Sequence, residues 1–170
     1  MTRIGIVSDT HGDVGRLEAA LTLLARQNVE IIVHCGDIGS AACVEAMGEA
    51  KAFVYAVAGN CDTGSDELPA AARRCGVHLA AQSVVIPLQG GLSAVATHGH
   101  DKRLLDQFIE QGKHAYVLHG HTHRTRDERI GGTRVINPGA LHRSQGSVPT
   151  VAVLDSVADT VEYLSVSTTD

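Results

Sequence analysis

The chain has 170 residues, 44% of them hydrophobic and 19% charged, with a formal net charge of −5 at pH 7. This composition predicts one soluble globular domain over residues 1–170, and the acidic balance and the lack of any apolar stretch near the roughly 20 residues that span a bilayer argue against nucleic-acid and membrane partners. The first residues lack a signal-peptide pattern and the four cysteines lack Cys-x-x-Cys pairing, so we expect reduced thiols in a cytoplasmic protein.

The first half of the chain alternates strand-like and helix-like segments. Apolar, β-branched runs predict strands at residues 3–7, 31–33 and 53–57. After the first strand, apolar residues recur in steps of three, four and three, the spacing of one helix face: Val14, Leu17, Leu21 and Leu24. Ser40 is the expected N-cap of a second helix over residues 41–49. This alternation predicts a parallel sheet with ligands at the carboxyl ends of its strands.

The second half is dominated by strands. Residues 83–88 and 92–97, joined by the turn signal Gln89-Gly90-Gly91, predict a β-hairpin. A helix is expected over residues 102–111, with an inner face made of Leu104, Leu105 and Phe108. Further strands are expected at residues 115–118, 125–130, 133–136, 151–154 and 161–166. The change from crossover units to a strand-rich order predicts two packed sheets within one domain.

Side chains that bind metals follow five of the apolar runs. In chain order, these candidate ligands are Asp9, His11, Asp37, Asn60, His98, His121 and His123. The first two and the last two are spaced so that both side chains point to one side of an extended segment. Carboxylate oxygens and imidazole nitrogens together suit Mn, Fe or Zn better than Ca or Mg. Taken singly, such residues are also common in turns and helix caps, but the seven together favour a metal site.

In this order, the residues resemble the pattern of the calcineurin-like metallophosphoesterase family: Asp-x-His, Gly-Asp, Gly-Asn-(His or Cys)-(Asp or Glu), His-Gly and Gly-His-x-His. The match runs from Asp9 to His123 and continues into Asn137-Pro138-Gly139, which is similar to the closing loop of that family. It looks most like the small, cap-free prokaryotic phosphodiesterase branch. The resemblance implies an α/β fold, a four-layer α/β/β/α sandwich of two packed mixed sheets flanked by helices.

The resemblance also implies a binuclear metal centre and a reaction. The implied ligands are Asp9, His11 and His123 for one metal, Asn60, His98 and His121 for the other, and Asp37 as the bridge between them. We expect two divalent ions, Mn first, with Fe, Zn, Ni or Mg as alternatives. The implied activity is hydrolysis of a small-molecule phosphate ester, a phosphodiester first of all, by a hydroxide that bridges the metals, with Asp37, Asn60 and His98 as the catalytic residues. A homo-oligomer is compatible with this reading.

The chain departs from the family pattern at two places. Many relatives carry a histidine, assigned to proton donation to the leaving group, where this chain has Cys61; a thiol with an ordinary pKa of about 8.5 is a poor substitute, and we expect Cys61 to be a bystander. Ala140 stands where relatives commonly have serine. Arg143 nearby could contact a substrate phosphate or be a solvated loop charge.

Other polar residues near these motifs are expected to support the ligands rather than bind metal. Asp62 is expected beside Asn60 in that role. Three histidines flank ligand positions, namely His34, His100 and His119, whereas three others are expected to be ordinary surface or core-edge residues: His78, His114 and His142.

Two other functions remain open from the sequence. One is a non-enzymatic scaffold on the same fold, as in a retromer subunit; scaffolds of this kind tend to lose metal-coordinating histidines, and this chain keeps every expected ligand. The other is a phosphomonoesterase or nuclease of the same superfamily. The acidic charge and the 3% aromatic content, which leaves few side chains for base stacking, disfavour a nuclease.

Overall fold

The structure is a computed structural model that describes residues 2–64, 66–143 and 147–167. The strands of its first sheet are β1 (Arg3–Val7), β2 (Ile31–His34), β3 (Phe53–Val57), β4 (His78–Ala80), β10 (Thr150–Asp155) and β11 (Thr160–Ser165). The strands of the second are β5 (Ser83–Pro87), β6 (Ser93–Thr97), β7 (Tyr116–Leu118), β8 (Thr125–Ile130) and β9 (Thr133–Pro138). The helices are α1 (Val14–Arg26), α2 (Ala41–Gly48), α3 (Glu67–Cys75) and α4 (Lys102–Gln111), with short 3-10 turns η1 (Asn60–Asp62) and η2 (Gln89–Gly91).

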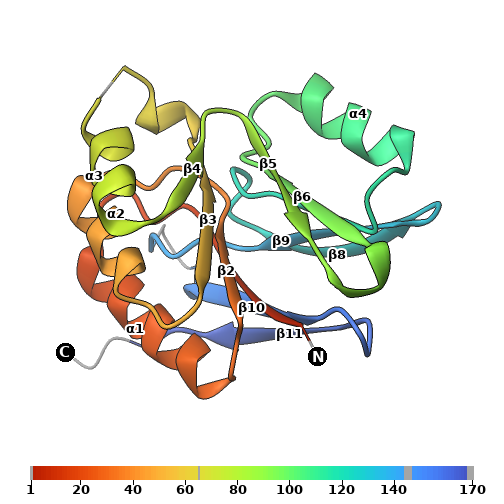
Figure 1. The fold of residues 1–170 in the computed structure, drawn as a ribbon, viewed down its shortest axis with the longest axis horizontal. Helices are drawn as coiled ribbons and strands as arrows, with labels where there is room; N and C mark the ends of the chain where they lie inside the picture. Colours follow the sequence, from red (N-terminus) through yellow and green to blue (C-terminus); the bar gives the residue numbers. More distant parts are fainter. Residues whose placement is uncertain (1, 65, 144–146, 168–170) are drawn as a thin grey trace.

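Both sheets are mixed and pack face to face between helices (Figure 1). The strand order is β11-β10-β1-β2-β3-β4 in the first sheet and β5-β6-β7-β9-β8 in the second. Strands β1 to β4 are parallel, as are β6, β7 and β9, and the other pairs are antiparallel. Helices α1, α2 and α3 cover the first sheet and α4 covers the second. The predicted four-layer α/β/β/α sandwich is confirmed.

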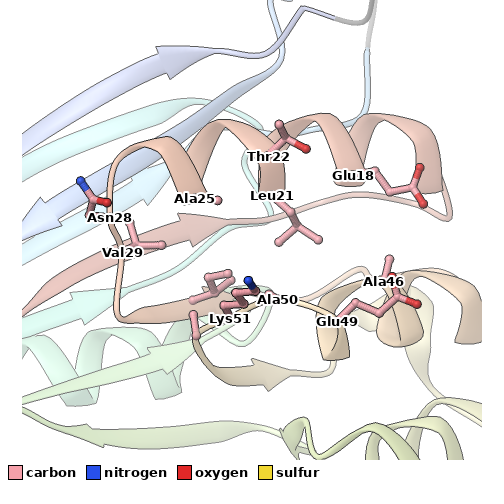
Figure 2. A pocket seen from close by; sticks show the side chains of 12 residues that line it. Glu18, Leu21, Thr22, Ala25, Asn28, Val29, Ala46, Glu49, Ala50 and Lys51 are labelled. Atoms are coloured by element: carbon pink, nitrogen blue, oxygen red, sulfur yellow. The ribbon is translucent and has the colours of Figure 1, made fainter.

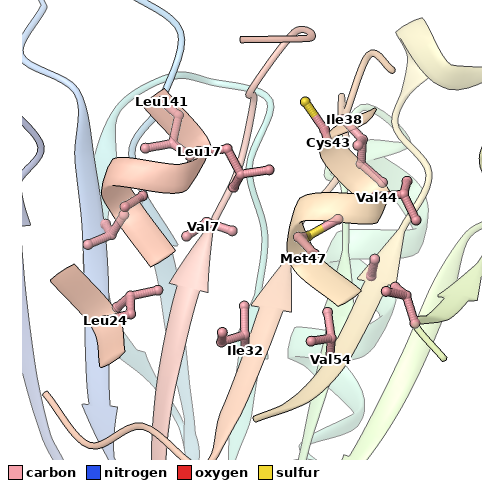
Figure 3. Packing of buried hydrophobic residues seen from close by; sticks show 14 of the residues in the cluster. Val7, Leu17, Leu24, Ile32, Ile38, Cys43, Val44, Met47, Val54 and Leu141 are labelled. Carbon is pink, nitrogen blue, oxygen red and sulfur yellow. The ribbon is translucent and has the colours of Figure 1, made fainter. Parts of the chain in front are cut away.

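The helices over the first sheet begin at the expected caps. The Asp13 carboxylate accepts the backbone N–H of Arg16 at the start of α1, and the Ser40 hydroxyl accepts that of Cys43 at the start of α2, so each cap satisfies a donor that the first turn leaves free. Right-handed crossovers place these helices on one face of the sheet. There they bury apolar side chains against the strands, as Figure 3 shows for Val7, Leu17, Leu24, Ile32 and Met47.

Two further layers of core follow from strand alternation. Ile4, Ile6 and Val33 point away from the helices and pack against residues of the second sheet such as Leu118 and Ile136. On the outer face of that sheet, five buried residues form a small core with α4: Val95, Leu105, Ile109, Val117 and Val135. The inner face of α4 was thus only partly predicted, because Ile109 is buried there whereas Leu104 is half-buried and outside this cluster.

The structure also contains elements that the sequence analysis did not assign. Residues 63–82 carry α3 and β4. Strands β10 and β11 return to the first sheet, where β10 pairs with β1 in antiparallel register (Ile4 opposite Leu154). The second half of the chain therefore contributes strands to both sheets. Among the described residues, no helix is long and apolar enough to cross a membrane.

We predict that Leu24→Ala lowers the free energy of unfolding by about 3 kcal/mol, because a fully buried leucine loses its transfer energy and leaves a cavity. The site cannot relax easily, since Leu24 packs so closely on the backbone of β1 that a Cβ on Gly5 would lie 2.7 Å from Leu24 Cδ1. Urea denaturation measures the change. Val157→Ala, at a side chain that is 64% exposed, is the control and should stay within about 0.5 kcal/mol of the wild type; equal changes in the two variants would contradict the packing described here.

Candidate metal centre

The loops after β1, β2, β3, β6 and β7 bring all seven candidate ligands into one cluster. Asp9 and His11 follow β1, Asp37 follows β2, Asn60 begins η1 after β3, His98 follows β6, and the His121/His123 pair follows β7. Because parallel strands end at the same edge, these loops converge where the two sheets meet. The sequence analysis placed these residues in one metal site, and the structure adds that both sheets contribute loops to it.

The backbone of the cluster is unusual. Among the described residues other than glycine, seven have a positive φ, and five of these are candidate ligands: Asp9, His11, Asp37, His121 and His123. The left-handed region costs an L-residue roughly 1–2 kcal/mol. Surrounding contacts must therefore hold these loops in place.

Backbone hydrogen bonds fasten the first two loops to each other. The N–H groups of Asp9 and His11 donate to the carbonyls of Gly36 and Asp37, at 3.0 and 2.9 Å. Buried His34 adds a side-chain link: its Nδ1 accepts the Gly36 N–H at 3.2 Å, so its Nε2 carries the proton and donates to Thr10 Oγ1 at 2.7 Å. Burial lowers the pKa of His34 to about 4, which keeps the ring neutral in this role.

Asp62 fastens the second loop to the third. Its buried carboxylate accepts three backbone N–H groups, from Ile38 at 3.0 Å, Gly39 at 2.9 Å and Gly59 at 2.8 Å. Asp62 therefore supports the loop that carries Asn60, and its role beside a bound metal stays a prediction. The loops approach so closely that a Cβ on Gly59 would lie 2.1 Å from an Asp37 carboxylate oxygen, which explains why glycine precedes Asn60.

Each aspartate of the cluster has one oxygen tied to a neighbouring loop and one turned inward. Asp9 Oδ2 accepts the His121 N–H at 3.0 Å, while Asp9 Oδ1 faces His123 Nε2 at 3.2 Å. Asp37 Oδ1 accepts the Cys61 N–H at 2.9 Å, while Asp37 Oδ2 lies 3.7 Å from His11 Nε2. Each carboxylate is therefore oriented by its outer oxygen, and the inner oxygen remains available as a ligand.

On the other side of Asp37, the cluster continues through His98. His98 Nδ1 donates to the Cys35 carbonyl at 2.8 Å, which turns Nε2 towards the cluster. This Nε2 lies 3.1 Å from Asn60 Oδ1 and 3.5 Å from Asp37 Oδ2. The rings of His98 and His121 are 5.1 Å apart, and burial lowers the pKa of His121.

The ligand atoms of the cluster are better suited to bind a cation than to hydrogen-bond with one another. Asp9 Oδ1 and His11 Nε2 are buried and have no hydrogen-bond partner among the described residues. Burial raises the pKa of Asp37, but the Cys61 N–H bond and the nearby His98 and His11 more than compensate, so its pKa lies below the ordinary value. Buried acceptors facing acceptors are costly unless a cation lies among them. The same donor set suits divalent transition metals.

A sixth segment, at the end of β9, packs against the loop that carries His121 and His123. Asn137 of the predicted Asn-Pro-Gly motif lies in β9 and is buried; its Nδ2 donates to the Gly120 carbonyl at 2.8 Å and to Thr122 Oγ1 at 3.1 Å. A Cβ on Gly120 would lie 1.9 Å from Ser8 Oγ, so only glycine fits between the two loops. His119 beside it is buried, which lowers its pKa to about 4.

Two exposed histidines border the ligands. His142, expected to be ordinary, has its ring 5.2 Å from the His11 ring, and its N–H donates to the Asp9 carbonyl at 2.8 Å. His100 has its ring 5.4 Å from that of His98. The sequence could have indicated that His142 lies near the ligands, because it follows Asn137 of the closing motif by five residues. Arg143 is exposed beside it, which is compatible with both expected roles, a phosphate contact and a solvated loop charge.

Cys61 lies closer to the ligands than expected. Its side chain is exposed, yet its sulfur belongs with His11 and Asp37 to a group whose ligand atoms all lie within 4.8 Å of one another. A hydrogen bond to the Asp37 carboxylate raises the pKa of its thiol. The thiol is thus a poorer proton donor than an unperturbed cysteine.

A separate cavity of about 720 Å³ opens between α1 and α2 (Figure 2). Its walls are largely apolar, with Leu21, Val29 and Ala50 among them, and Glu18, Glu49 and Lys51 at its rim. It contains none of the candidate ligands, so it is not part of the cluster.

Comparisons with known proteins agree with this geometry. A phosphodiesterase of Methanocaldococcus jannaschii is 29% identical over 154 residues, which cover 91% of this chain and 93% of that protein. A probable metallophosphoesterase of Mycoplasma pneumoniae is 29% identical over 167 residues, covering 91% and 90%. A solved structure of an archaeal phosphodiesterase superposes with a TM-score of 0.88 at 27% identity, over 96% of this chain and 99% of that one.

A model of the calcineurin-like phosphoesterase superfamily domain matches residues 2–159, which include every candidate ligand and the closing loop. Both sheets, the cluster at their shared edge and this match have one explanation: the chain belongs to the calcineurin-like phosphoesterase superfamily.

Proposed function

We propose that this protein is a metal-dependent phosphodiesterase that hydrolyses small phosphate esters at a binuclear centre. The observation that carries the proposal is the convergence of ligand atoms from five loops, among which the buried atoms Asp9 Oδ1 and His11 Nε2 have no hydrogen-bond partner in the part of the chain that the structure describes. The similarity to a phosphodiesterase over 91% of the chain supports diesters as the substrate class.

The geometry supports a division of the ligands between two ions. Asp9, His11 and His123 offer ligand atoms within 4.8 Å of one another, and we assign them to one ion. On the other side, Asn60, His98 and His121 form the second group. Asp37 Oδ2 lies 3.7 Å from His11 Nε2 and 3.5 Å from His98 Nε2. This oxygen is therefore suited to bridge the ions.

The charge of this ligand set favours an anionic substrate. Only Asp9 and Asp37 are anionic among the seven, so two divalent ions leave the centre at a net charge of about +2. When bound, such ions polarise phosphoryl oxygens and acidify water at neutral pH, so no protein nucleophile is required. The neutral Asn60 amide preserves this positive balance.

The catalytic residues of the proposal have separate tasks. Asp37 holds its bridging oxygen in place because its other oxygen is fixed by the Cys61 N–H. His98 is oriented by the Cys35 carbonyl, which sets the tautomer that leaves Nε2 free. Asn60 presents Oδ1 towards this nitrogen while its Nδ2 donates to Cys61 Sγ at 3.5 Å.

We propose Mn as the first metal, with Fe, Zn, Ni and Mg as alternatives, and the cytoplasm as the compartment. The carboxylate, imidazole and amide ligands suit the transition metals in this set better than Mg. All four cysteines are free, which supports a reducing compartment. The net charge of −5 supports a small ester rather than a nucleic acid as the substrate.

The scaffold alternative is not favoured. A surface used only to hold partners needs no converging ligand atoms, whereas here five of the seven candidate ligands lie at positive φ in loops that converge. A buried unpartnered carboxylate oxygen is a cost that a scaffold has no reason to retain.

We predict that Asp37→Ala lowers kcat/KM for bis(4-nitrophenyl) phosphate with Mn by at least about 1000-fold, since it removes the ligand shared by both ions and several kcal/mol of charge stabilisation. The control is Asp106→Ala. Asp106 has an exposed side chain on α4 that pairs with Lys102, and this variant should retain wild-type turnover. If kcat/KM of Asp37→Ala lies within about tenfold of the wild-type value, the bridging assignment is wrong.

A second prediction separates the two ions. Elemental analysis of metal-loaded protein should give two ions in the wild type and about one in His123→Ala and in His121→Ala, because each variant loses a ligand of a different site. Adding Asn60→Ala to His121→Ala should leave one ion, whereas adding it to His123→Ala should leave none. If both double variants bind the same amount of metal, the proposed division is wrong.

A further inference from the structure

Cys61 is held over the ligand cluster by its own backbone. It is the middle residue of η1, between Asn60 and Asp62. Its N–H donates to Asp37 Oδ1, and the adjacent Asp62 carboxylate ties the turn to the Asp37 loop by accepting the N–H groups of Gly59, Ile38 and Gly39. The backbone of Cys61 is therefore held beside the bridging aspartate, and its exposed sulfur lies near that carboxylate.

The surroundings of this sulfur point to a ligand. Cys61 Sγ, a ring nitrogen of His11 and a carboxylate oxygen of Asp37 all lie within 4.8 Å of one another. The Asp37 side chain is only 4% exposed, and His11 Nε2 is a buried atom without a partner among the described residues. The Asn60 amide donates to the sulfur at 3.5 Å, so the sulfur already acts as an acceptor.

We propose that Cys61 is a conditional metal ligand: it coordinates a thiophilic ion, such as Zn or Co, at the His11–Asp37 side of the centre, and stays uncoordinated when the ion is Mn or Mg. The inference rests on the proposed metal centre and goes beyond it, because it replaces the expected bystander role of this residue. On coordination, a sulfur–metal bond forms and the thiol proton leaves to solvent.

The difference between ions follows from ligand softness. Thiolate is a soft ligand that favours Zn and related ions, whereas Mn and Mg favour carboxylate, carbonyl and water oxygens. Structural and catalytic zinc sites accept cysteine sulfur together with imidazole and carboxylate ligands, which is the set present here. Cys61 should thus shift the metal preference of the centre towards Zn without being needed for the Mn form.

The other cysteines provide controls. Cys35 and Cys43 are buried in the cores. Cys75, at the end of α3, is half-buried and outside every metal-ligand group found among the described residues. Cys75→Ser is therefore the matched control for Cys61→Ser, because it makes the same chemical change away from the centre.

The first test is spectroscopic. Metal-free full-length protein is titrated with Co²⁺, and the near-ultraviolet sulfur-to-cobalt charge-transfer absorption is recorded beside the visible ligand-field bands. We expect the charge-transfer band in the wild type and in Cys75→Ser, and its loss in Cys61→Ser with the visible bands retained. Visible bands without charge transfer in the wild type would overturn the ligand assignment alone. A lack of cobalt binding in the wild type would overturn the metal centre itself.

The second test is metal affinity, measured by competition with a chelator. Cys61→Ser should lower the Zn affinity by at least about tenfold, since even the loss of a group that only supports a ligand lowers metal affinity by about 10- to 100-fold. The Mn affinity should change by less than about twofold. An equal loss for both ions would contradict the proposal, because it would reflect a disturbed Asp37 loop. Unchanged Zn affinity would contradict it as well.

Discussion

The division of labour between the two oxygens of each buried aspartate is the constraint on which the site depends. Asp9 and Asp37 each give one oxygen to a backbone N–H of another loop and keep the other for the cluster. A carboxylate fixed in this way cannot rotate to find a different donor. The cluster therefore remains an assembly of acceptors, and the energy that this costs in a buried setting becomes affinity for cations.

The rest of the fold positions these two residues. Parallel strands in both sheets end at one edge, which supplies loops from distant parts of the chain. Glycines allow the loops to approach within distances that a Cβ would prevent, as at Gly59 and Gly120. His34 then links the loops after β1 and β2, and Asp62 links the loops after β2 and β3. Positive φ at five candidate ligands is the local cost of this arrangement.

Sequence reasoning succeeded where a local pattern sets the structure. Strands β1 and β3 match their predicted bounds, and the Ser40 cap is present. Strands β5 and β6 form the predicted hairpin, joined by the Gly-rich turn. Helix α3 was missed, although Leu68, Ala71 and Ala72 are buried at helical spacing before Gly76, whose positive φ ends the helix. The sheet joined by β10 was not predictable, since a half-buried strand pattern does not name its partner. The position of His142 likewise depends on a long-range contact, since its N–H donates to the Asp9 carbonyl.

The pairing of β1 with β10, and of the Asp9 loop with residues 141–142, also constrains the order of folding. On the ribosome, the first ligands of the cluster emerge long before the segments that hold them, so the early βαβ units can form while the cluster is still open on one side. Contacts between residues so far apart in sequence slow folding. Metal capture is therefore expected to be a late event in the life of the nascent chain, after release of its last strands, and to act as the final step that makes the native topology persist.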